Sequence, residues 1–93
     1  MLDLNIYNLI DIINSNVKKI NITETDIDVD LTTIGLDSIA FIKLIVALEE
    51  NFNCEIPDSM LLVTKLNTLR KIFSCLQSII NGWFYVNWRY YKN

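Results

Sequence analysis

The residues best suited to chemistry in this chain are Asp37 and Ser38, which lie directly before a long apolar run. A serine at the start of a helix places its hydroxyl beside backbone N–H groups that have no acceptor within the helix. These groups and the helix dipole attract anions, so a phosphodiester on Ser38 would be stabilised there. The simpler interpretation is that Asp37 or Ser38 only caps the helix, because both residue types are preferred N-caps.

The chain contains no histidine, which excludes several common kinds of active site. Ser-His-Asp and Cys-His nucleophilic sites, HExxH zinc sites and Cys2His2 fingers all need that residue. An enzyme built from this sequence would have to use carboxylates such as Asp37 or Glu50, with no recognisable cofactor motif beside them. We therefore do not expect self-contained hydrolysis by this chain.

Cys54 and Cys75 could form one disulfide at most, and neither belongs to a CxxC motif. Cysteine often behaves as a small buried hydrophobe, so we interpret both as reduced core thiols, with the disulfide as the alternative. The segment Met1–Tyr7 has no basic residue and does not look like a secretory signal. The apolar stretch 39–48 is shorter than the roughly 20 residues that span a bilayer. We expect a cytoplasmic monomer.

Charge and aromatic residues divide the chain into a body and a tail. Residues 1–80 hold six basic and eleven acidic side chains, whereas residues 81–93 hold two basic side chains, no acidic one and six of the ten aromatics. We predict one domain over 1–80 and an aromatic C-terminal tail over 81–93. The tail could fold over the helices, act as a docking or self-association segment, or rest on a membrane surface. A sequence pI near 4.7 argues against binding to nucleic acid.

Apolar residues at helical spacing predict an all-α fold with three main helices, one short helix and a long first loop. The first helix has its apolar positions at i, i+3 and i+4, and the last is capped by Asn67 or Thr68. The expected elements are a helix over 2–17, a loop over 18–37, a helix over 39–52, a short helix over 60–64 and a helix from 69 that ends at Gly82.

The loop over 18–37 has no helical periodicity and needs other anchors. Its run Asp26-Ile27-Asp28-Val29-Asp30 imitates the start of an EF-hand, but Leu31 occupies the position of the invariant glycine, so we expect no calcium site. We interpret Lys18-Lys19 and Arg70-Lys71 as solvated basic pairs. The residues expected to tie the loop to the core are Ile27, Val29, Leu31 and Ile34.

The helix over 39–52 has two apolar stripes. The second stripe, Ile39, Ile42 and Val46, is displaced from the first and could either pack against the loop or the short helix, or remain open as a docking surface for partners. The first stripe, expected to face the core, consists of Phe41, Leu44, Ile45, Leu48 and Phe52.

Three segments of the sequence lie at consistent spacing: the serine motif over 34–39, the Ala47–Phe52 helix end and the Glu55-Ile56-Pro57 turn. Together they resemble the acyl and peptidyl carrier protein family, and the resemblance extends over roughly residues 2–80. By that resemblance Ser38 bears a 4′-phosphopantetheine arm derived from coenzyme A, and Asp37 and Leu36 help to present the serine to the transferase.

The resemblance implies a carrier that holds an acyl, aminoacyl or peptidyl intermediate as a thioester and leaves catalysis to other proteins. Its implied partners are a phosphopantetheinyl transferase, an adenylating or acyltransferring loading enzyme, and condensing or tailoring enzymes. The resemblance implies that Ile39, Ile42 and Val46 dock these partners, and we expect Met60 and Leu61 to add to that docking surface.

Ala40 and Lys43 depart from the family, because fatty-acid carriers place acidic residues at these positions. Docking should therefore depend less on charge steering and more on apolar contact. This favours a free-standing carrier that works in trans in a nonribosomal peptide, polyketide or related pathway. The alternatives are a fatty-acid synthesis carrier and an unmodified helical protein–protein interaction module with the same fold.

Overall fold

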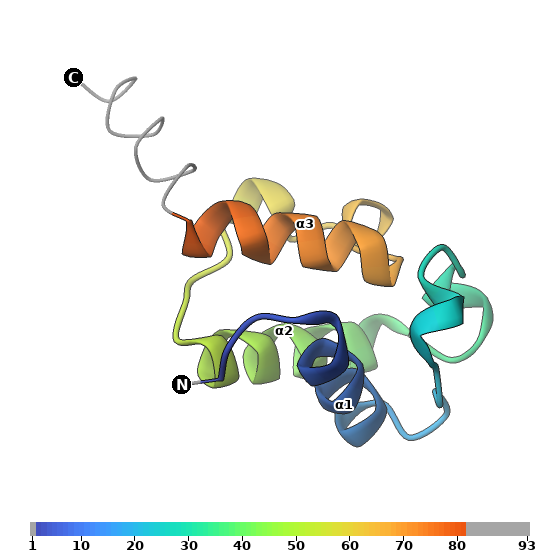
Figure 1. The fold of residues 1–93 in the computed structure, drawn as a ribbon. Coiled ribbons are helices and arrows are strands. Elements are labelled where there is room, and N and C mark those ends of the chain that lie inside the picture. Colours follow the sequence, from blue (N-terminus) through green and yellow to red (C-terminus); the bar gives the residue numbers. More distant parts are fainter. Residues whose placement is uncertain (1, 82–93) are drawn as a thin grey trace.

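The computed structural model describes residues 2–81, in which three α-helices surround one apolar core (Figure 1). The described residues contain no strand, so the predicted all-α fold is confirmed. None of these helices has the length and apolar character that crossing a bilayer requires. The helices are α1 (Ile6–Asn16), α2 (Ser38–Phe52) and α3 (Leu69–Ile80), with α1 in contact with both of the others.

Helix α1 begins at Ile6, four residues later than the predicted start at Leu2. Asn5 has an extended backbone, and its side-chain oxygen accepts a hydrogen bond from the Asn8 N–H at 2.9 Å, which makes it the N-cap. The Leu2 N–H donates to the carbonyl of Asn51 at the end of α2. The first residues therefore run along the end of α2 in place of a further helical turn.

Helix α2 begins at Ser38, one residue before the predicted start, because Asp37 is the cap of the two candidates that the sequence offered. The Asp37 Oδ1 accepts the Ala40 N–H at 2.8 Å, and the helix ends before Asn53, which adopts a left-handed backbone with φ of 50°. The predicted core stripe is buried in full. The residues of α2 that form this buried stripe are Phe41, Leu44, Ile45, Leu48 and Phe52.

The loop between α1 and α2 contains two single 3-10 turns, Glu24–Asp26 and Leu31–Thr33. Its expected anchors are only partly right. Leu31 is fully buried and Ile27 and Val29 are partly buried, but Ile34 is 39% exposed because it follows the second turn and points outward. The buried side chains that hold the loop are Ile20, Ile22, Leu31 and Leu36.

Hydrogen bonds join this loop to the start of α3. The Leu31 N–H donates to the Asn67 carbonyl, and the Arg70 N–H donates to the Ile27 carbonyl. The Arg70 guanidinium also pairs with the Asp28 carboxylate at 2.7 Å and lowers the pKa of that carboxyl below its usual value. Both charged side chains are exposed, so the backbone bonds contribute most of the anchoring.

The predicted short helix over 60–64 is wrong in detail. The structure has two separate 3-10 turns there, Asp58–Met60 and Val63–Lys65, closed by the Leu61 N–H to the Asp58 carbonyl and by the Leu66 N–H to the Val63 carbonyl. Leu62 has an extended backbone between them, which prevents the turns from merging into one helix.

Helix α3 starts after Thr68, whose hydroxyl accepts the Lys71 N–H at 3.1 Å, so Thr68 is the cap of the two candidates that the sequence offered. Its last residue is Ile80, which is exposed, and Phe73 is only partly buried. The predicted stop at Gly82 and the aromatic tail lie outside the described residues. The core face of α3 consists of Leu69, Ile72, Cys75, Leu76 and Ile79.

Both cysteines are free thiols, as predicted, although only Cys75 is a core residue and Cys54 is partly buried. Burial raises the pKa of each thiol above its ordinary value. The thiols therefore stay protonated at neutral pH, the form that is neither nucleophilic nor metal-binding.

The two faces of α2 make different contributions to stability. Leu44→Ala removes a fully buried side chain and should lower the free energy of unfolding by about 2–5 kcal/mol in urea denaturation. Ile42→Ala, two residues away on the exposed face, should change it by less than about 0.5 kcal/mol. Equal losses in both variants would contradict this assignment of the two faces.

Candidate functional site

Ser38 lies in the exposed first turn of α2, at the end of the long loop. Asp37 uses its carboxylate for the Ala40 N–H, and its backbone carbonyl accepts the Phe41 N–H at 2.8 Å. No hydrogen bond within residues 2–81 engages the Ser38 hydroxyl. The cap is therefore Asp37, and the serine is left with a free hydroxyl beside the helix N–H groups.

Leu36 anchors this turn in the core. It is buried, and its N–H donates to the Leu31 carbonyl at 2.9 Å. The three residues of the predicted motif thus have different positions: Leu36 points inward, Asp37 caps the helix and Ser38 remains accessible. The packing of Leu36 fixes where the serine is presented.

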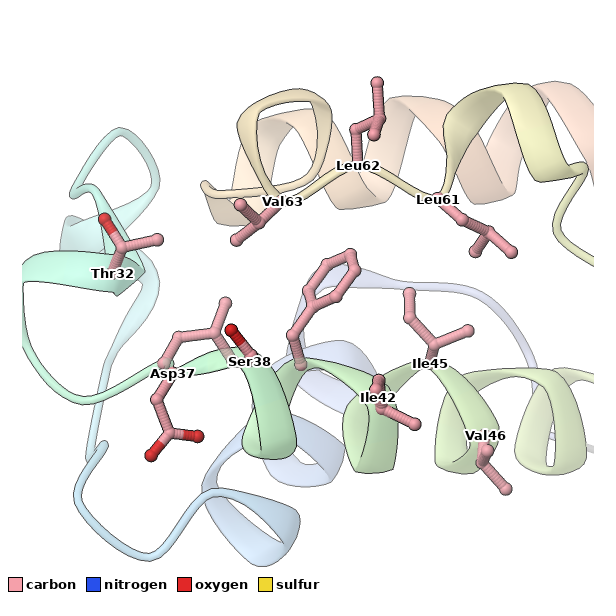
Figure 2. A pocket seen from close by; sticks show the side chains of 11 residues that line it. Thr32, Asp37, Ser38, Ile42, Ile45, Val46, Leu61, Leu62 and Val63 are labelled. Carbon is pink, nitrogen blue, oxygen red and sulfur yellow. The ribbon is translucent and has the colours of Figure 1, made fainter.

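An apolar groove of about 580 Å³ starts at Ser38 and runs beside α2 (Figure 2). Its other wall is the segment Leu61–Val63, which leads from the first of the two 3-10 turns after α2 into the second; Leu61 and Val63 point toward α2 and Leu62 points away. The groove residues contributed by α2 are Ser38, Phe41, Ile42, Ile45 and Val46. The shape and lining suit an extended apolar chain attached near Ser38.

The second stripe of α2 is open to solvent. Ile39, Ile42 and Val46 are 68%, 64% and 48% exposed, so the alternative in which they pack against the loop or the short helix is wrong. Met60 and Leu61 are partly buried, whereas Leu62, which the sequence did not single out, is 53% exposed. The run Met60–Val63 has no periodicity, so no pattern could have identified which of its side chains faces outward.

The acidic run that imitates an EF-hand has a structural role. Asp26 accepts the Thr23 N–H and Asp30 accepts the Thr32 N–H, while Asp28 pairs with Arg70. The bonds from Thr32 lower the pKa of Asp30 below its usual value. These carboxylates shape the loop, and the described residues contain no group of three or more side chains able to hold a metal ion.

The family model described as the phosphopantetheine attachment site matches residues 9–76, from the first turns of α1 to the last turns of α3. The chain belongs to this family. It is a carrier protein whose cofactor is 4′-phosphopantetheine, held covalently, and proteins of this kind interact with a phosphopantetheinyl transferase and with partner enzymes. No solved structure matches the chain.

The carrier's serine turn depends on a close approach at Gly35. This glycine has φ of +135°, and a Cβ added to it would lie 2.6 Å from the Lys19 Cβ. Both the backbone conformation and the contact exclude other side chains, because the Lys19 Cβ is fixed to the backbone and has no room to move away. The end of the loop is thereby held against the segment that follows α1.

Gly35→Ala should therefore destabilise the carrier by about 1–3 kcal/mol, measured by thermal or urea denaturation. Asn53→Gly is a matched control, since Asn53 also has a positive φ and already carries a side chain there. Glycine at that position should leave stability unchanged or raise it by less than about 1 kcal/mol. A tolerated Gly35→Ala would contradict the close approach.

Proposed function

We propose that the 4′-phosphopantetheine arm is attached to Ser38. The observation that carries this proposal is the exposed Ser38 hydroxyl, which has no hydrogen-bond partner within residues 2–81 and lies at the mouth of the apolar groove. Ser38 also lies inside the segment that matches the family. The residues present fit the group, because an arm leaving this oxygen has both an anion-binding helix end and an apolar surface within reach.

Attachment replaces one phosphorus–oxygen bond with another. The Ser38 oxygen forms a phosphodiester with the phosphopantetheine phosphorus, the pyrophosphate bond of coenzyme A breaks, and adenosine 3′,5′-bisphosphate leaves. We assign acceptance of the serine proton to the transferase, because in this proposal the partner enzymes supply the catalytic groups. The new anion then lies beside the first N–H groups of α2, where the helix dipole stabilises it.

Asp37 and Leu36 position the serine without taking part in the bond change. Asp37 fixes the first turn through the Ala40 N–H, and Leu36 fixes the approach of the loop through its burial. We propose that the transferase recognises this rigid turn together with the exposed stripe Ile39, Ile42 and Val46. Leu61 would extend that surface along the groove, with Met60 beside it.

The carrier role follows from the arm. We propose that its thiol holds an acyl, aminoacyl or peptidyl group as a thioester, and that partner enzymes supply all catalytic groups. The described part of the chain offers a free hydroxyl, a groove and a docking face, which are the requirements of a shuttle. The two protonated free thiols agree with a reducing compartment such as the cytoplasm.

For the pathway we propose nonribosomal peptide, polyketide or related synthesis. Support comes from α2, where Ala40 and Lys43 stand in place of the acidic residues that fatty-acid carriers present. The exposed aliphatic stripe next to Lys43 agrees with docking through apolar contact. A fatty-acid synthesis carrier is the alternative within the family, and an unmodified interaction module is the alternative outside it.

Intact mass spectrometry tests the attachment site. After incubation of the full chain with coenzyme A and a broad-specificity phosphopantetheinyl transferase, the mass should rise by one phosphopantetheine group. Ser38→Ala should abolish the gain, whereas Ser59→Ala, a matched change at another exposed serine, should leave it intact. A mass gain in the Ser38→Ala variant would overturn the assignment of the attachment site. If the wild type gains no mass under conditions that modify a control carrier, the unmodified interaction module is favoured.

We also propose that residues 1–80 form the carrier domain and that residues 81–93 are an accessory tail. A chain that ends at Asn81 should therefore fold and accept phosphopantetheine at a rate close to that of the full chain. Circular dichroism and the mass assay measure both properties. A large loss of thermal stability would show instead that the tail belongs to the folded core.

A further inference from the structure

Six basic side chains lie within residues 2–81, and they fall into two groups. Lys65 donates to the Ser59 carbonyl, Arg70 pairs with Asp28, and Lys71 donates to the Thr64 carbonyl. The other three have exposed side chains and make no hydrogen bond or ion pair within the described residues. These three are Lys18, Lys19 and Lys43.

The three unpaired lysines line one hollow of about 270 Å³ next to the serine turn. Lys18 and Lys19 follow α1, and Lys43 belongs to α2, so two distant segments contribute to it. Ile39 lines the same hollow and connects it to the exposed stripe. The hollow and the stripe therefore form one continuous surface beside Ser38.

The position of the lysines is fixed by the fold. The close approach of Gly35 to the Lys19 Cβ holds that segment against the start of α2. Lys43 lies one turn after Ile39 and one turn before Val46 on α2. The acidic groups nearby are Asp37, which lines the hollow and accepts the Ala40 N–H, and Glu50, which shares a shallower hollow with Lys43.

Three unpaired ammonium groups gathered within an otherwise acidic domain favour a partner with localised negative charge. The body over 1–80 has five more acidic than basic side chains, so a nucleic acid or an anionic membrane, whose charge extends over a large area, is repelled by the domain as a whole. A protein surface can match the local pattern, with carboxylates opposite the lysines and apolar side chains opposite the stripe.

We propose that this surface, formed by Ile39, Ile42 and Val46 with Lys18, Lys19 and Lys43 along its edge, docks a partner enzyme through an apolar patch bordered by carboxylates. The inference rests on the proposed function, because it assigns the face beside Ser38 to the enzymes that meet the arm. It adds the charge of that partner face, which the carrier role by itself does not define.

Two synthetic amphipathic helices serve as probes for the full, unmodified chain. Both carry leucines along one face, and the edges of that face carry glutamates in one peptide and lysines in the other. Titrations followed by NMR should show that the glutamate peptide binds and shifts the amides of Ile39, Ile42 and Val46. Its affinity should fall as salt is added, and the lysine peptide should bind at least about tenfold more weakly.

A variant with reversed charge at the three lysines separates the electrostatic part of peptide binding from the part due to apolar contact. The variant combines Lys18→Glu, Lys19→Glu and Lys43→Glu. It should bind the glutamate peptide about tenfold more weakly than the wild type does, and it should bind the lysine peptide more tightly. The substituted side chains are exposed and unpaired, so the variant should keep its helical circular dichroism spectrum. Lys65→Glu is the matched control, because Lys65 is exposed but already donates to the Ser59 carbonyl, and it should change neither affinity by more than about twofold.

Several results would overturn the proposal: equal binding of both peptides, no binding of the glutamate peptide, amide shifts away from the stripe, or binding to vesicles with anionic lipid that exceeds binding to the peptide. These outcomes are independent of the attachment site, because the probes need no phosphopantetheine. A normal mass gain with no binding of the glutamate peptide rejects this inference and retains the proposed function. Binding of the glutamate peptide as expected, without a mass gain at Ser38, rejects only the attachment site.

Discussion

The burial of one face of α2 is the constraint on which the rest of the domain depends. Leu44 and Leu48 are fully buried, and burying a side chain of this size contributes about 1.5–3 kcal/mol each. Once this face is fixed against the core, the geometry of a helix places Ile39, Ile42 and Val46 on the solvent side. The same rigid helix therefore stabilises the fold and offers an apolar surface next to its first turn.

Around that helix, the carrier separates the functions of three neighbouring residues. Leu36 is buried and anchors the loop, Asp37 satisfies the start of the helix, and Ser38 retains a free hydroxyl. If Ser38 were the cap, its oxygen would be occupied by a backbone N–H. Because Asp37 performs the capping, a phosphodiester on the serine would cost no structural hydrogen bond.

Much of the fold could be predicted because it depends on local chemistry. The two stripes of α2 follow from helical spacing and were confirmed. Residue type narrowed the starts of α2 and α3 to two candidate caps each, and the structure selects Asp37 and Thr68. The errors lie at the boundaries of elements, which depend on backbone conformation and contacts as well as on apolar spacing. Helix α1 starts late because Asn5 caps it while the Leu2 N–H bonds to the end of α2. The segment 58–65 forms two turns because Leu62 has an extended backbone between them.

The sequence by itself determined the family, the serine motif and the amphipathic pattern of α2, because each is encoded within a short stretch of chain. It could not show that Lys43 shares a hollow with Lys18 and Lys19, which precede it by more than twenty positions and read as an ordinary solvated pair. Only the tertiary structure brought them together, through the packing of α1 on α2 and the close approach of Gly35 to Lys19. Periodicity reports which face of one helix is apolar, but which charges meet across two segments is decided by packing.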